Sequence, residues 1–260
     1  MSIFNRMTLA AVAFSTSVLG AQAENLRVGI SAEPYPPFSS LDSSGKWVGW
    51  EIEIIDAVCA AAKFECQITP VAWDGIIPSL TSKKIDVIMS SMSITKERKK
   101  TIDFSDKYYS DNGYTVVGPK GVAVEPTAEG LKGKILGVQT STNAQVYASR
   151  HFQDSVAQLK TYQTEDEVEQ DLVAGRIDAA LASRITISEF LNTDQGKGCC
   201  EVKGTVANDP EIMARGVGAG VRKGDTEILE KINAGIKAIR DNGKYAEISN
   251  RYFGFDIYGD

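Results

Sequence analysis

The segment LTSKKIDVIMSS at residues 80–91 matches LVAGRIDAALAS at residues 172–183 without a gap. Each copy has the pattern of a helix end, a tight turn, a buried strand and a serine at the carboxyl end of that strand. Ser91 and Ser183 fall at equivalent positions. The repeat therefore predicts two similarly built α/β lobes. Ligands of open α/β sheets bind at the carboxyl ends of the strands, so we expect both sheets to face a common cleft.

Apolar strand-like runs alternate with helical patterns along most of the chain, which is typical of an open, mostly parallel α/β sheet. The first series predicts strands at 26–30, 66–72 and 85–89, helices at 50–62 and 75–82, and a short helix beginning near residue 95. The second predicts extended segments at 114–118, 134–138, 156–162 and 177–181 and helices at 142–151 and 165–174. A last extended stretch at 216–221 precedes helices at 225–241 and 244–252.

The first residues resemble a secretory signal peptide. Arg6 precedes an apolar run at 7–20, and Ala21-Gln22-Ala23 has the small-x-small form of a cleavage site. The run is shorter than the ~20 apolar residues of a transmembrane helix. We therefore expect residues 1–23 to be removed and a periplasmic or secreted protein to begin near Glu24.

Charge and cysteine content exclude several classes of protein. The chain has 34 acidic and 28 basic residues and a formal net charge of −6, which argues against nucleic-acid binding. Cysteines in an exported chain favour disulfides over metal thiolates. Cys59 and Cys66 lie close enough to bridge, whereas the adjacent Cys199 and Cys200 could be free thiols or a vicinal disulfide. The single histidine, His151, has no ligand pattern around it, so no metal or other cofactor is expected.

The residues that follow the strand at 85–89 have the composition of an anion site. Ser90, Ser91 and Ser93 supply hydroxyls, Thr95 occupies the position of a helix N-cap, and Arg98 falls in the first helical turn. Backbone N–H groups at a helix start favour an anion, and arginine can bind a carboxylate through two parallel hydrogen bonds. The segment therefore predicts a carboxylate receptor. The alternative is a surface arginine beside an ordinary capped helix.

An ordered series of motifs resembles the periplasmic polar-amino-acid-binding proteins of ABC importers, especially the lysine/arginine/ornithine- and histidine-binding group. The motifs are YPPF (35–38), GWEIE (49–53), WDGIIPSL (73–80), the segment 90–98, KYY (107–109), GRIDAA (175–180), GAGVRK (218–223) and RYFG (251–254). The resemblance covers nearly the whole chain after residue 23. Each motif alone is weakly specific, whereas the ordered set is highly specific.

This resemblance implies a two-lobe periplasmic-binding-protein fold that closes around an amino acid. Lobe 1 would hold residues 24–110 and 216–260, lobe 2 residues 114–212, and a two-segment hinge residues 111–113 and 213–215. Cys59 and Cys66 match a disulfide in that group. The family also implies a monomer that delivers its ligand to an ABC permease in the inner membrane.

Carried over by position, Arg98 is expected to bind the α-carboxylate of the ligand, with Ser91, Ser93 and Thr142 completing that part of the pocket. Tyr35 and Trp73 are expected to sandwich the ligand side chain. The neighbours expected in the same site are Ser90, Met92, Val138 and Ser141.

Two positions depart from the family pattern. Ser183 stands where the family has an acid for the α-ammonium group, and Ala32 stands where it has an acid for a cationic side chain, with Glu33 next in line. Serine in this context resembles relatives that bind opines, amino acids with an N-carboxyalkyl group whose second carboxylate an acid would repel. A cationic amino acid is the first hypothesis for the ligand, and an opine or another amino-acid conjugate is the alternative.

A third hypothesis is an enzyme on the same scaffold, since some relatives are dehydratases or lyases that need a poised acid or base. The expected cleft residues are hydroxyls, aromatics and an arginine that stays charged. Glu33 is the one plausible acid among them. We therefore expect a binding protein rather than a catalyst.

Overall fold

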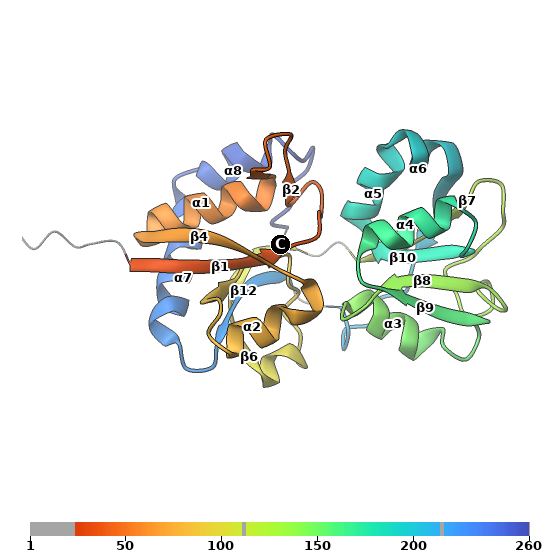
Figure 1. Ribbon diagram of the computed structural model, residues 1–260, viewed down its shortest axis with the longest axis horizontal. Coiled ribbons are helices and arrows are strands. Elements are labelled where there is room, and N and C mark those ends of the chain that lie inside the picture. Colours follow the sequence, from red (N-terminus) through yellow and green to blue (C-terminus); the bar gives the residue numbers. More distant parts are fainter. Residues whose placement is uncertain (1–23, 111–112, 214–215, 260) are drawn as a thin grey trace, which may run out of the picture.

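The computed structural model describes residues 24–110, 113–213 and 216–259. The expected signal peptide and the hinge residues 111–112 and 214–215 lie outside the described residues. The described chain forms two five-stranded sheets, each covered by helices, and Figure 1 shows them as two units side by side. We call the unit that contains β1 lobe 1 and the unit that contains β7 lobe 2. The two-lobe α/β architecture expected from the repeat is confirmed.

Lobe 1 has the strand order β4-β1-β5-β12-β6. The strands are β1 (Glu24–Ser31), β4 (Phe64–Val71), β5 (Val87–Ile88), β6 (Ile102–Tyr109) and β12 (Val217–Arg222), with a small hairpin of β2 (Ser40–Leu41) and β3 (Trp47–Val48). The helices are α1 (Trp50–Ala62), α2 (Ile76–Thr81), α7 (Thr226–Asp241) and α8 (Lys244–Ser249), and the 3₁₀ turns are η1 (Trp73–Gly75) and η2 (Arg98–Lys100).

Lobe 2 has the strand order β11-β7-β10-β8-β9. Its strands are β7 (Tyr114–Pro119), β8 (Ile135–Gln139), β9 (Gln158–Tyr162), β10 (Ala179–Ser183) and β11 (Cys200–Thr205). Its helices are α3 (Asn143–His151), α4 (Glu165–Val173), α5 (Arg184–Asn192) and α6 (Asp194–Cys199). In Figure 1, α4, α5 and α6 lie above the sheet and α3 lies below it.

One strand in each sheet runs against the other four. In lobe 1, β1 pairs in parallel with β4 and β5, whereas β12 is antiparallel to both β5 and β6. In lobe 2, β8 pairs in parallel with β9 and β10, whereas β7 is antiparallel to both β10 and β11. The two reversed strands begin with Tyr114 and Val217, just after the segments where the chain passes between the lobes.

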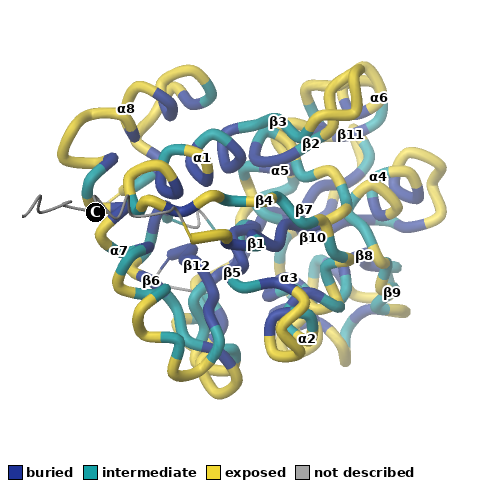
Figure 2. The backbone as a smooth tube through the Cα atoms, turned by 60° about the vertical axis from the view of Figure 1, so that its left-hand side comes forward, coloured by how far each residue is buried: buried dark blue, intermediate teal, exposed yellow. Residues whose placement is uncertain are grey.

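Apolar side chains pack on both faces of each sheet, and Figure 2 shows the buried residues concentrated in the central strands. Trp50 at the start of α1 is fully buried in lobe 1, and its indole N–H donates to Ser249 Oγ at 3.0 Å. Phe38, Tyr109 and Phe253 pack against its ring. This cluster joins residues from both halves of the sequence, so the C-terminal segment is part of the lobe 1 core.

Some elements differ from the prediction. The strand expected at 85–89 is reduced to Val87–Ile88, and the expected short helix is the single 3₁₀ turn η2. The sequence did not predict β6, β11, α5 or α6. Both β6 and β11 are edge strands that carry charged residues, such as Lys107 and Glu201. Edge strands tolerate charge, so they lack the continuous apolar run that marks a central strand.

All four cysteines are paired. The Cys59–Cys66 bond joins the end of α1 to β4 with a Cα–Cα distance of 6.1 Å. Cys199 and Cys200 form a vicinal disulfide at the junction of α6 and β11, and Cys200 is buried. The expected Cys59–Cys66 disulfide is therefore present. None of the helices in the described part of the chain combines the length and apolar character that crossing a bilayer requires.

We predict that replacing both Cys59 and Cys66 by alanine lowers the free energy of unfolding by about 2–3 kcal/mol, because the bond limits the freedom of the unfolded chain. Urea denaturation monitored by Trp fluorescence measures the change. The double replacement of Cys199 and Cys200 by alanine is the control. It opens a far smaller ring and is expected to cost less. An equal loss in both variants would contradict the ring-closure explanation.

Candidate functional site

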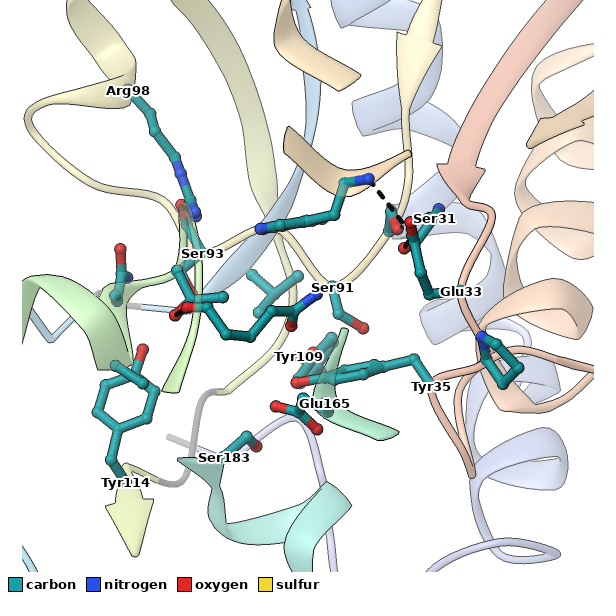
Figure 3. Close-up of a pocket in the computed structure, with 18 residues that line it drawn as sticks. Ser31, Glu33, Tyr35, Ser91, Ser93, Arg98, Tyr109, Tyr114, Glu165 and Ser183 are labelled. Atoms are coloured by element: carbon teal, nitrogen blue, oxygen red, sulfur yellow. Dashed lines mark hydrogen bonds between the residues drawn. The ribbon is translucent and has the colours of Figure 1, made fainter. Parts of the chain in front are cut away.

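A pocket between the lobes is built from the ends of six strands. Ser31, Tyr109, Gln139 and Ser183 are the last residues of β1, β6, β8 and β10, and Tyr114 and Val217 are the first residues of the reversed strands. The other lining residues are Glu33, Pro34, Tyr35, Trp73, Ser90, Ser91, Ser93, Arg98, Thr142, Asn143, Ala144 and Glu165. Figure 3 shows these side chains converging from both lobes on one space.

Arg98 reaches from lobe 1 to lobe 2. Thr95 Oγ1 accepts the backbone N–H of Arg98 at 3.1 Å, which fixes the start of η2. The guanidinium donates to the carbonyls of Ser93 at 3.1 Å and Ser141 at 3.2 Å. Its Cζ lies 5.5 Å from the centroid of the Trp73 ring, a distance typical of a cation–π contact. The side chain is therefore positioned by several contacts and stays charged at any physiological pH.

Ser91 is held by a buried carboxylate. It adopts a φ of +50°, and both its N–H and its hydroxyl donate to Glu51, at 2.7 and 3.0 Å. The Tyr108 hydroxyl donates to the same carboxylate, which is 1% exposed. Burial raises the pKa of Glu51, and the hydrogen bonds from Tyr108 and Ser91 oppose that rise. Glu51 thus fixes the turn between β5 and Arg98, and the polar hydrogens of Ser91 point to it.

The start of α3 brings unpaired donors to the pocket from lobe 2. The Thr142 hydroxyl caps this helix: it accepts the N–H of Gln145 at 3.1 Å and donates to the Gln139 carbonyl at 2.8 Å. Asn143 and Ala144 follow, in the turn whose N–H groups have no acceptor within the helix. The Asn143 side chain is 8% exposed, and its Nδ2 has no hydrogen-bond partner among the described residues. A buried donor without a partner is costly, so Nδ2 is suited to an acceptor on a ligand.

On the lobe 1 side of the pocket, Tyr35 and Trp73 lie near the carboxylate of Glu33. Tyr35 stacks on Phe38 with 5.7 Å between ring centroids, and the Trp73 indole donates to the Ser141 carbonyl at 3.3 Å. The Glu33 carboxylate accepts from the Ser31 hydroxyl at 2.5 Å and from the Trp73 backbone N–H at 3.3 Å. These bonds hold Glu33 beside the aromatic residues.

A second carboxylate enters from lobe 2. Glu165 is the first residue of α4, after the capping box formed by Thr164 and Glu167. Glu165 is partly exposed as a lining residue, but protein surrounds its carboxylate. This desolvation raises the pKa of Glu165 to about 7, while a hydrogen bond from the Thr186 hydroxyl acts in the opposite direction. The Thr186 hydroxyl also contacts the Ser183 carbonyl at 3.3 Å, so Thr186 connects the two lining residues Glu165 and Ser183 on one side of the pocket.

The structure brings together most of the residues expected in the site. Met92 and Val138 instead lie in the hydrophobic cores at 1% and 0% exposure. Val138 precedes the strand-end residue Gln139, and side chains alternate between faces along a strand. Ser141 contributes its carbonyl as the acceptor for Arg98 and Trp73. Lining residues that the sequence analysis missed are Ser31, Pro34, Tyr109, Tyr114, Gln139, Asn143, Ala144, Glu165 and Val217. The strand-end positions of Ser31 and Gln139 are a signal that could have identified them.

Within residues 24–110, 113–213 and 216–259, no cluster of three or more His, Cys, Asp or Glu side chains is arranged to hold a metal ion. The charged lining residues are Arg98, Glu33 and Glu165. The site therefore offers one cation, two carboxylates, four aromatic residues and a helix start.

Comparison with known proteins assigns this arrangement to a family. The model for bacterial extracellular solute-binding proteins, family 3, matches residues 26–255. The L-arginine-binding protein of Pseudomonas aeruginosa is 42% identical over 235 residues, which cover 90% of each chain. The histidine-binding periplasmic protein of Escherichia coli K12 is 37% identical over 251 residues, 95% of each chain.

Solved structures give the same result. An ancestral arginine-binding protein bound to arginine superimposes with a TM-score of 0.80 at 33% identity, covering 90% of this chain and all of that one. The ancestral amino-acid-binding protein AncCDT-1, a precursor of cyclohexadienyl dehydratase, gives 0.77 at 31% identity, covering 88% of this chain and 95% of that one.

We predict that Glu51→Gln lowers the free energy of unfolding by about 1–3 kcal/mol and speeds hydrogen exchange at the Ser91 amide, because the amide NH₂ leaves at least one buried donor without an acceptor. Urea denaturation and amide exchange measure the two effects. Glu53→Gln is the control, since Glu53 lies on the same helix and pairs with Arg251 and Tyr252 away from the pocket. Unchanged Ser91 exchange in Glu51→Gln would refute a role for Glu51 in holding the turn.

Proposed function

This chain belongs to family 3 of the bacterial extracellular solute-binding proteins, and we propose that it captures a cationic amino acid of the arginine, lysine, ornithine or histidine type for an ABC importer. The observation that carries this proposal is the charge pattern of the cleft. One guanidinium, Arg98, and two carboxylates, Glu33 and Glu165, line it. A cationic amino acid carries one carboxylate and two cationic groups, so each charge of the ligand has an opposite charge in the pocket.

The α-carboxylate is assigned to the side where Arg98 faces the start of α3. The N-terminus of a helix favours an anion, and the unpaired Asn143 Nδ2 adds a donor there. Arg98 belongs to lobe 1 and α3 to lobe 2. A carboxylate bound between them therefore bridges the lobes.

The ligand side chain is assigned to the space beside Tyr35 and Trp73. An aliphatic stem or a guanidinium can pack against such rings. Glu33 lies at this side, held by Ser31 and the Trp73 backbone. We therefore assign Glu33 the distal cationic group of the ligand, in keeping with the expectation that it replaces the family acid absent at Ala32.

Binding would act by shifting the protein toward a closed form. Contacts between the lobes already include the Ser141 carbonyl with Arg98 and Trp73, the packing of Ile185 on the lobe 1 core and the exposed Lys96–Glu211 pair. A ligand that bridges both lobes binds this form better and so increases its population. We propose that residues 111–113 and 213–215 form the hinge, and that a permease in the inner membrane recognises the closed monomer in the periplasm.

An opine or another conjugate is the weaker alternative. The opine hypothesis is based on Ser183, which stands where the family has an acid. The absence of that acid would leave room for a second carboxylate near the amine of the ligand. Glu165 borders the same side of the pocket through Thr186. A second carboxylate on the ligand would therefore meet another carboxylate of the protein, which is unfavourable.

A catalytic role receives less support than a receptor role. The lining residues other than Glu33 and Glu165 are hydroxyls, aromatics, amides, small or apolar residues and Arg98. Both carboxylates have an assigned use in pairing with ligand cations. Incubation of L-arginine, L-lysine and L-histidine with the protein, followed by NMR, is expected to show no conversion.

The test of the proposed function is a thermal-shift screen of residues 24–260, unfolded and refolded to remove co-purified ligand. A ligand that binds only the native state raises the melting temperature by mass action. We expect shifts with L-arginine, L-lysine, L-ornithine or L-histidine, and smaller ones with neutral or acidic amino acids. Shifts with octopine or nopaline alone would replace the proposal by the opine alternative.

We predict that Arg98→Ala weakens binding of the ligand identified in that screen by at least about 100-fold, because it removes paired charge-assisted hydrogen bonds to the carboxylate. Isothermal titration calorimetry measures the loss. Arg184→Ala is the matched control. Arg184 follows Ser183 but is exposed and is not among the described lining residues. The Arg184→Ala variant is therefore expected to bind the ligand within about twofold of the wild-type affinity. An Arg98→Ala affinity equal to that of the control would contradict the carboxylate assignment.

Asn143→Leu is expected to separate binding from stability. The substitution removes a buried donor that has no partner among the described residues, so the free energy of unfolding of the empty protein should stay the same or rise. Affinity should fall by about 5- to 10-fold as one hydrogen bond to the ligand is lost. Denaturation without ligand and calorimetry with ligand give the two values. A fall in stability with unchanged affinity would assign Asn143 a purely structural role.

A further inference from the structure

We propose that Glu165 binds the α-ammonium group of the ligand and thereby restricts the site to amino acids whose α-amine is free. This inference rests on the proposed function and adds to it the residue that reads the amine. Glu165 reaches the cleft from the start of α4, and Figure 3 shows its carboxylate within the group of lining side chains, toward Ser183.

The two carboxylates of the pocket have different surroundings. Glu33 accepts hydrogen bonds from Ser31 and from the Trp73 backbone, so it is fixed at the aromatic side. Glu165 has a hydrogen bond with the Thr186 hydroxyl, and Thr186 itself is 4% exposed. Glu165 therefore retains more capacity to accept hydrogen bonds from a ligand. If the side chain of the ligand occupies the aromatic side, Glu165 is the carboxylate left for the amine.

The residues that bind the α-carboxylate and the α-ammonium of the ligand must lie close to one another. The α-carboxylate and the α-ammonium are bonded to the same carbon, so the residues that bind them must face the same small region. The helix start that receives the carboxylate and the helix start that carries Glu165 both follow strands of lobe 2, and β8 and β9 are neighbours in that sheet. Adjacent parallel strands end at the same edge, which brings the starts of α3 and α4 to one side of the cleft.

The environment of Glu165 makes its charge depend on the ligand. The other charged groups on its helix are Asp166, Glu167, Glu169 and Asp171. Burial, followed by repulsion from Glu165 and Asp166, raises the pKa of Glu169 to about 8. From α5 and β10, Thr186 and Ser183 contribute only hydroxyls and backbone, and from β8 the facing residue is the uncharged Gln139.

The charged groups on neighbouring elements are paired, exposed or across the cleft. On β9, Lys160 pairs with Asp171 at 2.7 Å. The charged residues of α6, Asp194 and Lys197, are exposed. Across the cleft stand Glu33 and Arg98.

An ammonium group beside Glu165 stabilises the ionised carboxylate, so its pKa falls on binding from the value of about 7 in the empty pocket. The bound state then holds fewer protons than the free state. By linkage, affinity rises with pH up to about pH 8, where the carboxylate of the free protein is already ionised. We expect affinity to fall by about tenfold between pH 8 and pH 6, and about half a proton to be released per ligand bound at pH 7.

Glu165 would also select ligands with a free, positively charged α-amine over ligands in which the amine is modified. Acylation of the amine removes its charge, and an N-carboxyalkyl group adds a carboxylate at the same place. Acylation would leave Glu165 desolvated beside a neutral amide. An N-carboxyalkyl group keeps a charged secondary ammonium, but its added carboxylate would be repelled by Glu165, so both changes disfavour binding. Glu165 would thus let a site with Ser183 at the end of β10 discriminate in favour of free amino acids.

The experiment compares L-arginine with Nα-acetyl-L-arginine, and L-lysine with Nα-acetyl-L-lysine, by calorimetry on the wild-type protein, Glu165→Gln and Asp166→Asn. Asp166→Asn is the matched control, since it removes one negative charge from the same helical turn at an exposed position. Wild type and Asp166→Asn are expected to bind the free amino acids at least about 100-fold more tightly than the acetylated ones. Glu165→Gln should lose about 10- to 100-fold for the free amino acids at pH 8, with little change for the acetylated ones.

The pH profile distinguishes ligand binding from a merely structural role. Between pH 6 and pH 8 the slope should disappear in Glu165→Gln and persist in Asp166→Asn. Proton release by the wild-type protein, measured at pH 7 in two buffers of different ionisation enthalpy, needs no variant and so stands even if Glu165→Gln folds poorly. Wild-type binding of L-arginine or L-lysine without proton release, together with an unchanged Glu165→Gln affinity, would overturn the assignment but leave the proposed function intact. Failure of the wild-type protein to bind any cationic amino acid would instead remove the proposed function.

Discussion

The direction of the strands places the polar residues of the site. In each sheet, four strands share one direction, which leads toward the cleft. The reversed strands β7 and β12 run the other way and begin at the cleft. Each crossing of the chain between the lobes therefore starts the reversed strand of the sheet that it enters. Residues at the cleft edge of a sheet have fewer neighbours within the sheet, so their side chains and the loops that follow remain available to a ligand. Pairing fixes their positions, as Ser183 opposite Tyr114 and Val217 opposite Tyr109 show.

The hydrogen bonds around the cleft are largely made before any ligand arrives. Ser31 N–H donates to the Ser90 hydroxyl at 2.8 Å, Ser91 is bound to Glu51, and Thr142 caps α3. These contacts position the groups that line the pocket rather than leave them to be ordered on binding, which reduces the entropic cost of association. Among the described lining residues, Asn143 is the exception, because its buried Nδ2 has no hydrogen-bond partner. Because most hydrogen-bond donors around the pocket are already used within the protein, few remain to bind a ligand.

The charges of the pocket are linked to the stability of the empty protein. Two carboxylates and one guanidinium line the same partly enclosed space. Desolvation of Glu165 raises its pKa to about 7, which means that its ionised form is less stable there than in water. A cation beside it removes that penalty. If Glu165 binds the ligand amine as proposed, the burial of this one carboxylate both favours a positively charged ligand and makes the affinity depend on pH.

The sequence by itself determined the class of fold and predicted half of the residues that line the pocket. The repeat of helix end, strand and serine predicted two α/β lobes, and the segment from Ser90 to Arg98 predicted a carboxylate receptor, because local patterns of burial, capping and charge are properties of neighbouring residues. The tertiary structure alone decided which residues meet across the cleft. Glu165 lies 67 residues after Arg98 in the sequence, and Tyr114, Asn143 and Val217 reach the pocket from other strands and helices. Met92 and Val138 have the same local context as true lining residues but face the cores. Whether a side chain points to a core or to the cleft depends on strand register, on the reversal of β7 and β12 and on the packing of the two lobes, which are interactions between segments far apart in the chain.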